Sequence, residues 1–168
     1  EQAEAPLLET SRKLQMENWS FNTDYSITLA KDADGYINAP SNALRIEVNP
    51  FDYPDYEIVQ RGAKLYERKG NTYIFTQDIV ADVTYAMDWE ELPEHARQYF
   101  AAKAGRDLQM STIGSQDLNE INYGIEIEAK AAFLDQETTL SNHSMLQGHP
   151  SVMSSYFSYV PANALRRK

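Results

Sequence analysis

Cysteine is absent from the 168 residues, which excludes a disulfide framework, a thiol nucleophile and a thiolate-bound zinc site. Glycine and proline number only 7 each while 42% of residues are apolar, as is typical of a folded globular chain and not of a disordered or fibrous one. No apolar run reaches the roughly 18–20 residues of a membrane-spanning helix, so no membrane is expected as a partner. The chain opens with Glu1 and without a signal-peptide pattern, so we expect no secretion signal and further residues upstream.

Basic residues are the minority charge, with 15 Lys and Arg against 25 Asp and Glu, and the formal net charge is −10. Sequence-specific DNA-binding proteins neutralise phosphates with clustered Lys and Arg, so this composition disfavours that class. The one basic cluster, Arg166-Arg-Lys168, fits contact with an acidic partner surface, contact with nucleic acid, or a solvated chain end.

Common catalytic and metal-binding motifs are also missing from the sequence, which contains no GxSxG, P-loop, HExxH or GxGxxG. The three histidines are scattered, and we predict no catalytic residue, no metal site and no cofactor. Asp32-Ala-Asp-Gly35 begins like a calcium loop, but Tyr36 and Ala43 occupy later ligand positions, so a simple turn is predicted.

Carboxylate pairs leave an enzymatic alternative open. Glycosidases need two carboxyl groups held roughly 5–10 Å apart in a cleft. The candidates here are Asp52 with Asp55, and the group Asp88, Glu90 and Glu91. The alternatives to a structural role are therefore a small glycan hydrolase and a monomeric binding module.

The hydrophobic pattern changes period twice along the chain. Residues 7–18 fit the end of a helix, and residues 25–87 show period-two alternation with turn clusters between short runs, which predicts an antiparallel sheet or small barrel. Within this region residues 63–75 predict a hairpin that turns at Gly70-Asn71. Helices are predicted again over residues 93–113 and 115–142.

The last predicted helix has two apolar stripes separated by charge. One stripe contains Leu118, Ile121, Ile125, Ala129, Ala132 and Leu140, and the other contains Tyr123, Ile127, Ala131 and Leu134. Asp117, Glu120, Glu128 and Asp135 line one gap, and Glu126, Lys130 and Glu137 line the other. A surface helix normally has one apolar stripe, so two stripes suggest its own domain and a neighbouring subunit as partners, or two contacts within one chain.

Residues 143–168 have no helical or strand period but are rich in apolar and aromatic residues. A segment of this kind usually wraps its own domain or a partner. The candidate partner-binding residues are Tyr156, Phe157, Tyr159, Leu165, Arg166 and Arg167.

An ordered series of short motifs resembles one known family. The series comprises Trp19-Ser-Phe-Asn22, Ile27-Thr-Leu29, Asp34-Gly-Tyr-Ile37, Arg61-Gly62, Leu65-Tyr-Glu-Arg68, Tyr73-Ile-Phe75, Leu92-Pro93, Ala96-Arg-Gln-Tyr99 and Lys103-Ala-Gly-Arg106. It resembles tail tubular protein A, the adaptor or gatekeeper ring protein of short-tailed, podovirus-type phages, most clearly over residues 9–113. Relative to that family, we expect a further N-terminal helical segment to be missing here.

The resemblance implies a structural virion protein and an α+β fold. The expected fold is a helical bundle from residues 1–20 and 91–142, an inserted antiparallel β domain at 21–90, and an extended tail at 143–168. The resemblance implies a ring of twelve copies between the portal and the tail nozzle, a tubular protein B-like partner, around the channel through which DNA leaves. It implies no catalytic residues, and the expected location is the virion tail after synthesis in the host cytoplasm.

Two roles for the last helix follow from this hypothesis. Tyr123, Ile127, Ala131 and Leu134 are the expected subunit interface. Asp117, Glu120, Glu128 and Asp135 are the expected channel-facing residues, because an acidic wall repels DNA and keeps it moving. A solvated outer face is the alternative for these four carboxylates.

Overall fold

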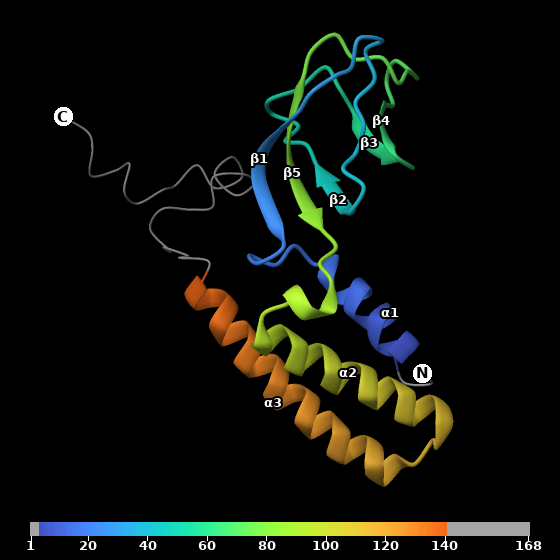
Figure 1. The fold of residues 1–168 in the computed structure, drawn as a ribbon, viewed down its shortest axis with the longest axis vertical. Coiled ribbons are helices and arrows are strands. Elements are labelled where there is room, and N and C mark those ends of the chain that lie inside the picture. The colour runs from blue at the N-terminus through green and yellow to red at the C-terminus, as the bar shows by residue number, and fades with distance from the viewer. Residues whose placement is uncertain (1–3, 141–168) are drawn as a thin grey trace, which may run out of the picture. The chain divides into compact units, whose positions relative to one another are not determined.

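The fold is known from a computed structural model that describes residues 4–140. It is α+β, as predicted, with one helix, five strands and a pair of long helices in chain order (Figure 1). The elements are α1 (Glu4–Gln15), β1 (Thr23–Leu29), β2 (Ala43–Glu47), β3 (Ile58–Arg61), β4 (Lys64–Glu67), β5 (Ile79–Tyr85), the 3-10 helix η1 (Trp89–Glu91), α2 (Glu94–Thr112) and α3 (Gln116–Leu140). None of these helices is long and apolar enough to cross a bilayer.

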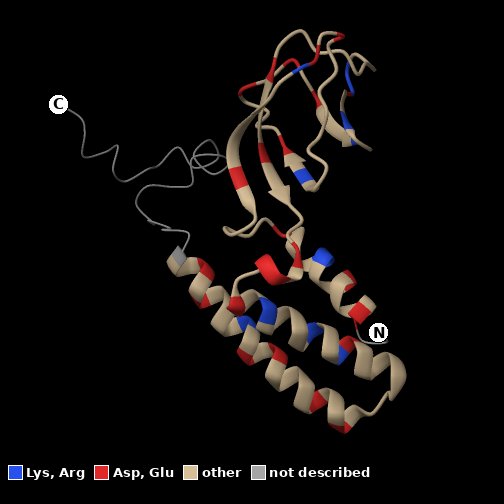
Figure 2. Ribbon diagram, viewed as in Figure 1, with Lys and Arg blue, Asp and Glu red and all other residues tan. Residues whose placement is uncertain are grey.

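The chain divides into two compact units. The helical unit is drawn from Glu1–Asn22 and Tyr85–Ser141, and the β unit contains Thr23–Thr84. Acidic side chains occur in both units, whereas four Lys and Arg of the β unit fall within residues 61–69 and colour the β3–β4 hairpin (Figure 2). Four of the six basic residues of the β unit therefore lie on or directly after this hairpin, and the other two are Lys31 and Arg45.

Polar side chains fix the end of α1 in the helical unit. The helix stops at Gln15, earlier than the expected residue 18, because Asn18 adopts a left-handed φ of 56° and the Trp19 indole N–H donates to the Leu14 carbonyl over 2.7 Å. The Gln15 side chain accepts the Met87 N–H at 2.7 Å and donates to the Met87 carbonyl at 3.2 Å. Two segments distant in sequence are thereby joined by an almost fully buried amide.

A three-stranded sheet in the order β1-β5-β2 forms the larger layer of the β unit. Strands β1 and β5 are antiparallel, with Leu29 opposite Ile79 and Thr23 opposite Thr84. Along β5 the side chains of Ile79, Ala81 and Val83 are buried while Val80 is exposed, which confirms the predicted alternation. The second layer is the antiparallel β3–β4 hairpin, whose Leu65 joins the core.

The predicted hairpin at residues 63–75 is wrong in its pairing. Strand β4 pairs with the preceding β3, and the chain reverses at Gly62, whose φ is +62°. After β4 only a single bridge joins Glu67 to Thr72, although Asn71 does take the expected left-handed φ of 51°. The physical reason is the Glu67 side chain, which accepts the backbone N–H groups of Lys69 and Gly70 and closes the chain into a tight loop before a ladder forms.

The turn predicted at Asp32-Ala-Asp-Gly35 is confirmed. One Asp32 carboxylate oxygen accepts the N–H groups of Asp34 and Tyr36 at 3.0 and 2.8 Å. Gly35 has φ +87°, and a Cβ there would lie 2.8 Å from the Ile74 Cγ2. Both the backbone conformation and the close approach therefore require glycine at this position.

Glu67 gives the β unit a pH-dependent contribution to stability. Burial alone would raise the pKa of this carboxyl, but the N–H groups of Gly70, Glu57 and Lys69 outweigh burial and lower the pKa below its ordinary 4.5. A depressed pKa in the folded state stabilises the fold above the unfolded-state value, and this contribution disappears as the pH falls through the folded-state value.

We therefore expect Glu67→Gln to lower the urea midpoint of the β unit at neutral pH, with the difference from the unaltered chain shrinking in acid. Tryptophan is confined to the helical unit, so far-UV circular dichroism and hydrogen exchange at the β3 and β4 amides are the suitable measurements. Glu57→Gln, at an exposed carboxylate beside the same loop, is the matched control. An equal loss for Glu67→Gln at both pH values would contradict the electrostatic explanation.

Candidate assembly surface on the long helix

Helix α3 packs against α2 chiefly through a polar face, and among the described residues of the two apolar stripes only Ala129 is packed against the core. The Arg106 guanidinium donates to the Glu126 carboxylate and to the Asn119 side-chain oxygen, each over 2.8 Å. Glu126 is only 9% exposed, and its hydrogen bond is the main cause that raises the pKa of Arg106. This charge-assisted hydrogen bond therefore joins α2 to α3.

The same polar face continues toward the C-terminal end of α3. A Glu137 oxygen accepts the Ser20 backbone N–H at 2.8 Å, and the other lies 3.9 Å from His95 Nε2. Glu137 is 8% exposed. Glu126 and Glu137, expected to line a gap between stripes, are thus two of the residues through which α3 contacts the rest of its unit.

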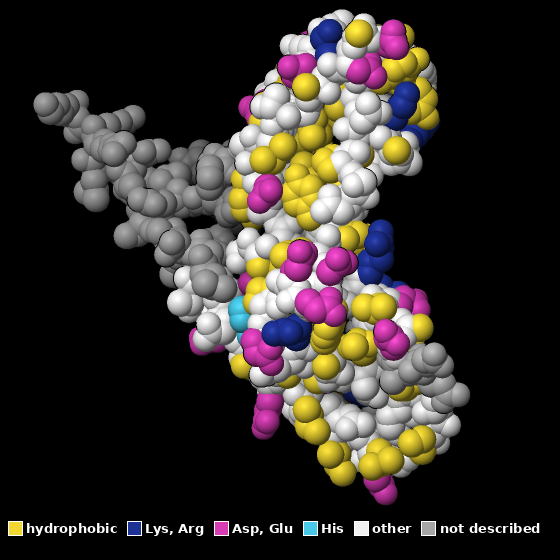
Figure 3. All heavy atoms as spheres, in the orientation of Figure 1, with side chains coloured by type: hydrophobic (Ala, Val, Ile, Leu, Met, Phe, Trp, Pro, Cys, Tyr) yellow, Lys and Arg dark blue, Asp and Glu magenta, His cyan; other side chains and the backbone are white. Residues whose placement is uncertain are grey.

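The large side chains described in both apolar stripes are exposed, whereas Ala129 is partly buried. In the stripe of expected interface residues, the exposed fractions are 49% for Tyr123, 48% for Ile127 and 41% for Leu134, and Ala131 is also exposed. In the other stripe they are 42% for Leu118, 62% for Ile121 and 53% for Ile125. Hydrophobic side chains accordingly lie open on the surface of the helical unit between acidic ones (Figure 3).

The four expected channel-facing carboxylates are all exposed. At about 100° per residue, Asp117, Glu128 and Asp135 lie about 180° around α3 from Glu126, and Glu120 lies nearer the Ile127 stripe. Since Glu126 marks the packed face, these carboxylates point away from the body of the helical unit. The helix therefore presents an acidic ridge flanked by one apolar stripe on each side.

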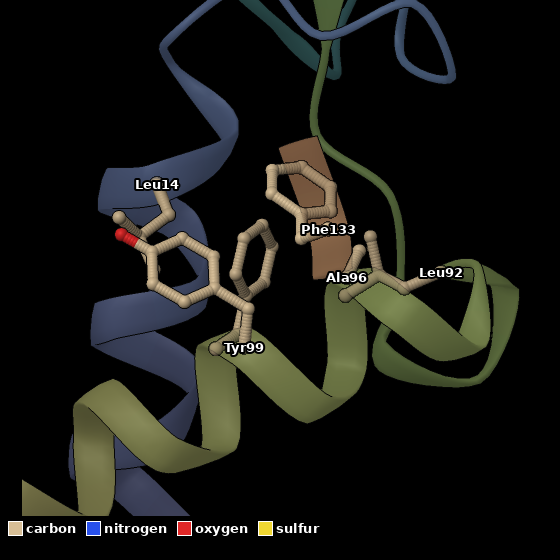
Figure 4. Packing of buried hydrophobic residues seen from close by; sticks show 6 residues of the cluster. Leu14, Leu92, Ala96, Tyr99 and Phe133 are labelled. Atoms are coloured by element: carbon tan, nitrogen blue, oxygen red, sulfur yellow. The ribbon is translucent and has the colours of Figure 1, made fainter. Parts of the chain in front are cut away.

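Phe133 is the residue that the sequence pattern did not reveal. It belongs to neither stripe, yet it is fully buried at the centre of a cluster with Leu14, Leu92, Ala96, Tyr99 and Phe100. Its ring lies 4.6 Å from that of Trp19 and 5.5 Å from that of Tyr99, and Figure 4 shows it projecting from α3 toward α2 and α1. The sequence did hold one indication of this role: Phe133 is an aromatic residue on the charged face of the helix, three residues after Lys130 and four before Glu137.

The remaining predicted site residues are the carboxylates of the hydrolase alternative and the partner-binding residues of the C-terminal segment. Glu90 and Glu91 lie on the short η1 segment and Asp88 directly precedes it, and all three are exposed. Asp52 and Asp55 are exposed in the β2–β3 connection. Among residues 4–140 no group of three His, Asp or Glu side chains is placed to hold a metal ion. The expected partner-binding residues from Tyr156 to Arg167 lie outside the described residues.

A helix that packs through its charged side and exposes two apolar stripes is typical of a subunit of a larger protein assembly. Comparison with known proteins agrees: the family described as tail tubular protein matches residues 1–143. The chain belongs to this family and is a structural protein of a phage tail.

A curated relative gives a more specific likeness. Tail tubular protein A of Klebsiella phage KP34 is 29% identical over 97 residues, which make up 57% of this chain and 50% of the relative. The chain thus spans about half the length of this relative, and the resemblance drawn from the short motifs is confirmed at the level of the family.

Proposed function

We propose that the chain is a subunit of the adaptor ring that joins the phage portal to the tail nozzle and surrounds part of the DNA ejection channel. The observation that carries this proposal is the surface of α3, where six large apolar side chains are 41–62% exposed around a core that is already complete. Membership of the tail tubular protein family supports it. The ring is expected to hold twelve copies in the virion tail, after synthesis in the host cytoplasm.

The stripe of Tyr123, Ile127, Ala131 and Leu134 is the proposed contact with a neighbouring copy. Subunits of a closed ring meet through heterologous contacts, in which a patch on one copy meets a different patch on the next. The opposite stripe around Ile121 and Ile125 is available on the same helix for the second half of such a contact. One helix then serves two neighbours.

The acidic ridge of Asp117, Glu120, Glu128 and Asp135 is the proposed channel lining. Reversing all four to Lys should slow genome ejection, most strongly at low salt, because each new phosphate contact retains the passing duplex. Time-resolved DNA release from particles carrying the variant measures this. Reversal of three exposed carboxylates of the β unit (Asp34, Asp55 and Asp78) is a control with nearly the same change in net charge. Ejection at the unaltered rate in the α3 variant would place the ridge on the outside of the ring.

Each region of the chain has a proposed role in the ring. Residues 1–20 with 91–142 would form the ring's helical domain, 21–90 its inserted β domain, and 143–168 the segment that grips the portal or a neighbouring copy. DNA would pass the ring without sequence-specific binding, and no cofactor, metal or catalytic residue takes part.

The decisive experiment mixes the full-length protein with the portal ring of the same virus and images the product by negative stain. The expected result is a cap of twelve copies on one end of the portal. Absence of any portal-bound cap would overturn the proposed function. The hydrolase alternative would then be tested by release of sugars from host capsule, with Asp88→Ala as the comparison.

A further inference from the structure

The β3–β4 hairpin carries cations laid over tyrosine rings, a feature that the proposed function does not use. The Arg61 guanidinium carbon lies 3.7 Å from the centroid of the Tyr66 ring, and the Lys64 ammonium lies 3.7 Å from that of Tyr36. Tyr66 also meets Tyr73 edge-on, with 4.7 Å between ring centroids. These five residues, Arg61, Lys64, Tyr36, Tyr66 and Tyr73, are called the cationic face.

The strand register places both cations on the side of the hairpin opposite Leu65, with the Tyr66 ring, which is 8% exposed, covered by Arg61. Arg61 lies opposite Lys64 in the ladder, and Tyr66 shares their side because it is two residues from Lys64. Leu65 alternates to the other side and is only 1% exposed within the core. Arg61 and Lys64 therefore lie on the outer side of the hairpin, whose Lys and Arg residues are blue in the ribbon of Figure 2.

The two cations are oriented but not neutralised. Among the ion pairs of residues 4–140, none includes Arg61 or Lys64, whereas nearby Arg68 pairs with Glu57 at 2.7 Å. Cation–π contacts hold each side chain over a ring, so an anionic partner meets groups that lose little conformational freedom on binding. This arrangement favours binding of an acidic surface.

A surface of opposite charge exists on the same unit. Glu47, Asp52 and Asp82 line a hollow of about 100 Å³ together with Tyr25 and Val80. Arg45 pairs with Glu47, so Asp52 and Asp82 supply the negative charge of the hollow that no cation of residues 4–140 neutralises. Val80 and Asp82 alternate with the buried Ile79, Ala81 and Val83, so this acidic hollow opens on the outer side of the three-stranded sheet. The two charged surfaces thus belong to different outer faces of one unit.

We propose that the cationic face of one copy docks against the acidic hollow of the next copy in the ring. Two different and complementary patches on each chain are what a heterologous, closing contact requires. A second copy fits this face better than nucleic acid does, because Arg61 and Lys64 already cover the tyrosine faces on which bases would stack. This inference rests on the ring of the proposed function.

Charge exchange between copies tests the contact. The first double variant, Arg61→Glu with Lys64→Glu, reverses the charge of the cationic face. The second, Asp52→Lys with Asp82→Asn, reverses the charge at one position of the hollow and removes it at the other. Asparagine is chosen at position 82 because its side-chain oxygen can still accept the Ser26 N–H, which lies 2.8 Å from the Asp82 carboxylate. Each double variant alone should need about tenfold more protein to form rings, measured by sedimentation velocity at low salt. An equimolar mixture of the two double variants should recover assembly. In a ring where the two variants alternate, the reversed cationic face of one meets the altered hollow of the other at every second contact, and two unaltered surfaces meet at the remaining contacts.

Controls separate this inference from the proposed function. Lys31→Glu changes an exposed charge of the β unit outside both surfaces and should assemble normally, and thermal unfolding checks that every variant is folded. Unchanged assembly of both double variants would overturn the proposed docking, and so would a loss of assembly that the mixture does not restore. Neither result would contradict the ring of the proposed function. Retention on duplex DNA that depends on Arg61 and Lys64, with assembly unaffected, would overturn it in favour of nucleic acid. If the unaltered chain forms no ring with or without portal, the proposed function fails and the inference fails with it.

Discussion

Ile127→Asp is expected to prevent ring assembly while leaving the monomer folded. The Ile127 side chain is 48% exposed on α3 and is not part of the buried cluster of the helical unit. A carboxylate placed there costs the monomer little, but in a subunit contact it is buried without a partner in every copy of the ring. The concentration required for assembly should rise about a hundredfold or more, as a penalty of a few kcal/mol implies.

Leu134→Asp, two turns further along the same stripe, should act in the same way, and Ile127→Val serves as the matched control that keeps the apolar surface. Sedimentation velocity of the chain alone and negative-stain imaging with portal give the assembly state, while circular dichroism reports folding. Normal rings from both Asp variants would remove the stripe from the interface. Unfolded Asp variants would show that the stripe contributes to the core of the monomer.

Phe133→Ala should have the largest effect on the stability of the helical unit. The ring is fully buried and contacts aromatic residues from two segments, with centroid separations of 4.6 Å to Trp19 after α1, and of 5.5 Å to Tyr99 and 5.6 Å to His95 on α2. Truncating such a phenylalanine leaves a cavity and typically costs about 3–5 kcal/mol. Both Trp residues belong to this unit, so the loss should appear as a lower urea midpoint in tryptophan fluorescence.

Ile121→Ala is the matched comparison, because Ile121 is an apolar residue of the same helix that is 62% exposed. Its truncation should change the stability of the monomer by about 0.5 kcal/mol or less. The two variants together measure which side of α3 holds the unit together. Equal losses, or a larger loss for Ile121→Ala, would contradict the assignment of the polar face as the packed face.

The sequence was sufficient to predict the α+β class, the three helices and the alternation along β5. These features depend on the local period of hydrophobic residues, and the tertiary contacts of this fold agree with the secondary structure that this period predicts. The β3–β4 pairing was not predictable in this way, because the choice between two neighbouring partners for β4 depends on the hydrogen bonds of one side chain, Glu67.

The orientation of α3 shows a second limit of pattern reasoning. Apolar stripes normally mark the buried side of a helix, so the sequence favoured at least one stripe as an internal contact. The structure buries the charged side instead, because Arg106 on α2 satisfies Glu126 and one aromatic residue, Phe133, fills the remaining space. A pairing between charged residues on two helices has no signature in the hydrophobic pattern of either one.

The hydrogen bond between Asn22 and Tyr85 has a consequence for how this fold can vary. The Tyr85 N–H donates to the Asn22 carbonyl over 2.8 Å, and the Asn22 side chain donates to the Tyr85 carbonyl over 3.1 Å. The points where the chain leaves and re-enters the helical unit are therefore adjacent, and bridging them directly requires closing only a very short loop, at small entropic cost. The helical unit therefore has a single insertion point. The segment between residues 22 and 85 can become longer, become shorter or be replaced by another domain while the helices keep their own core.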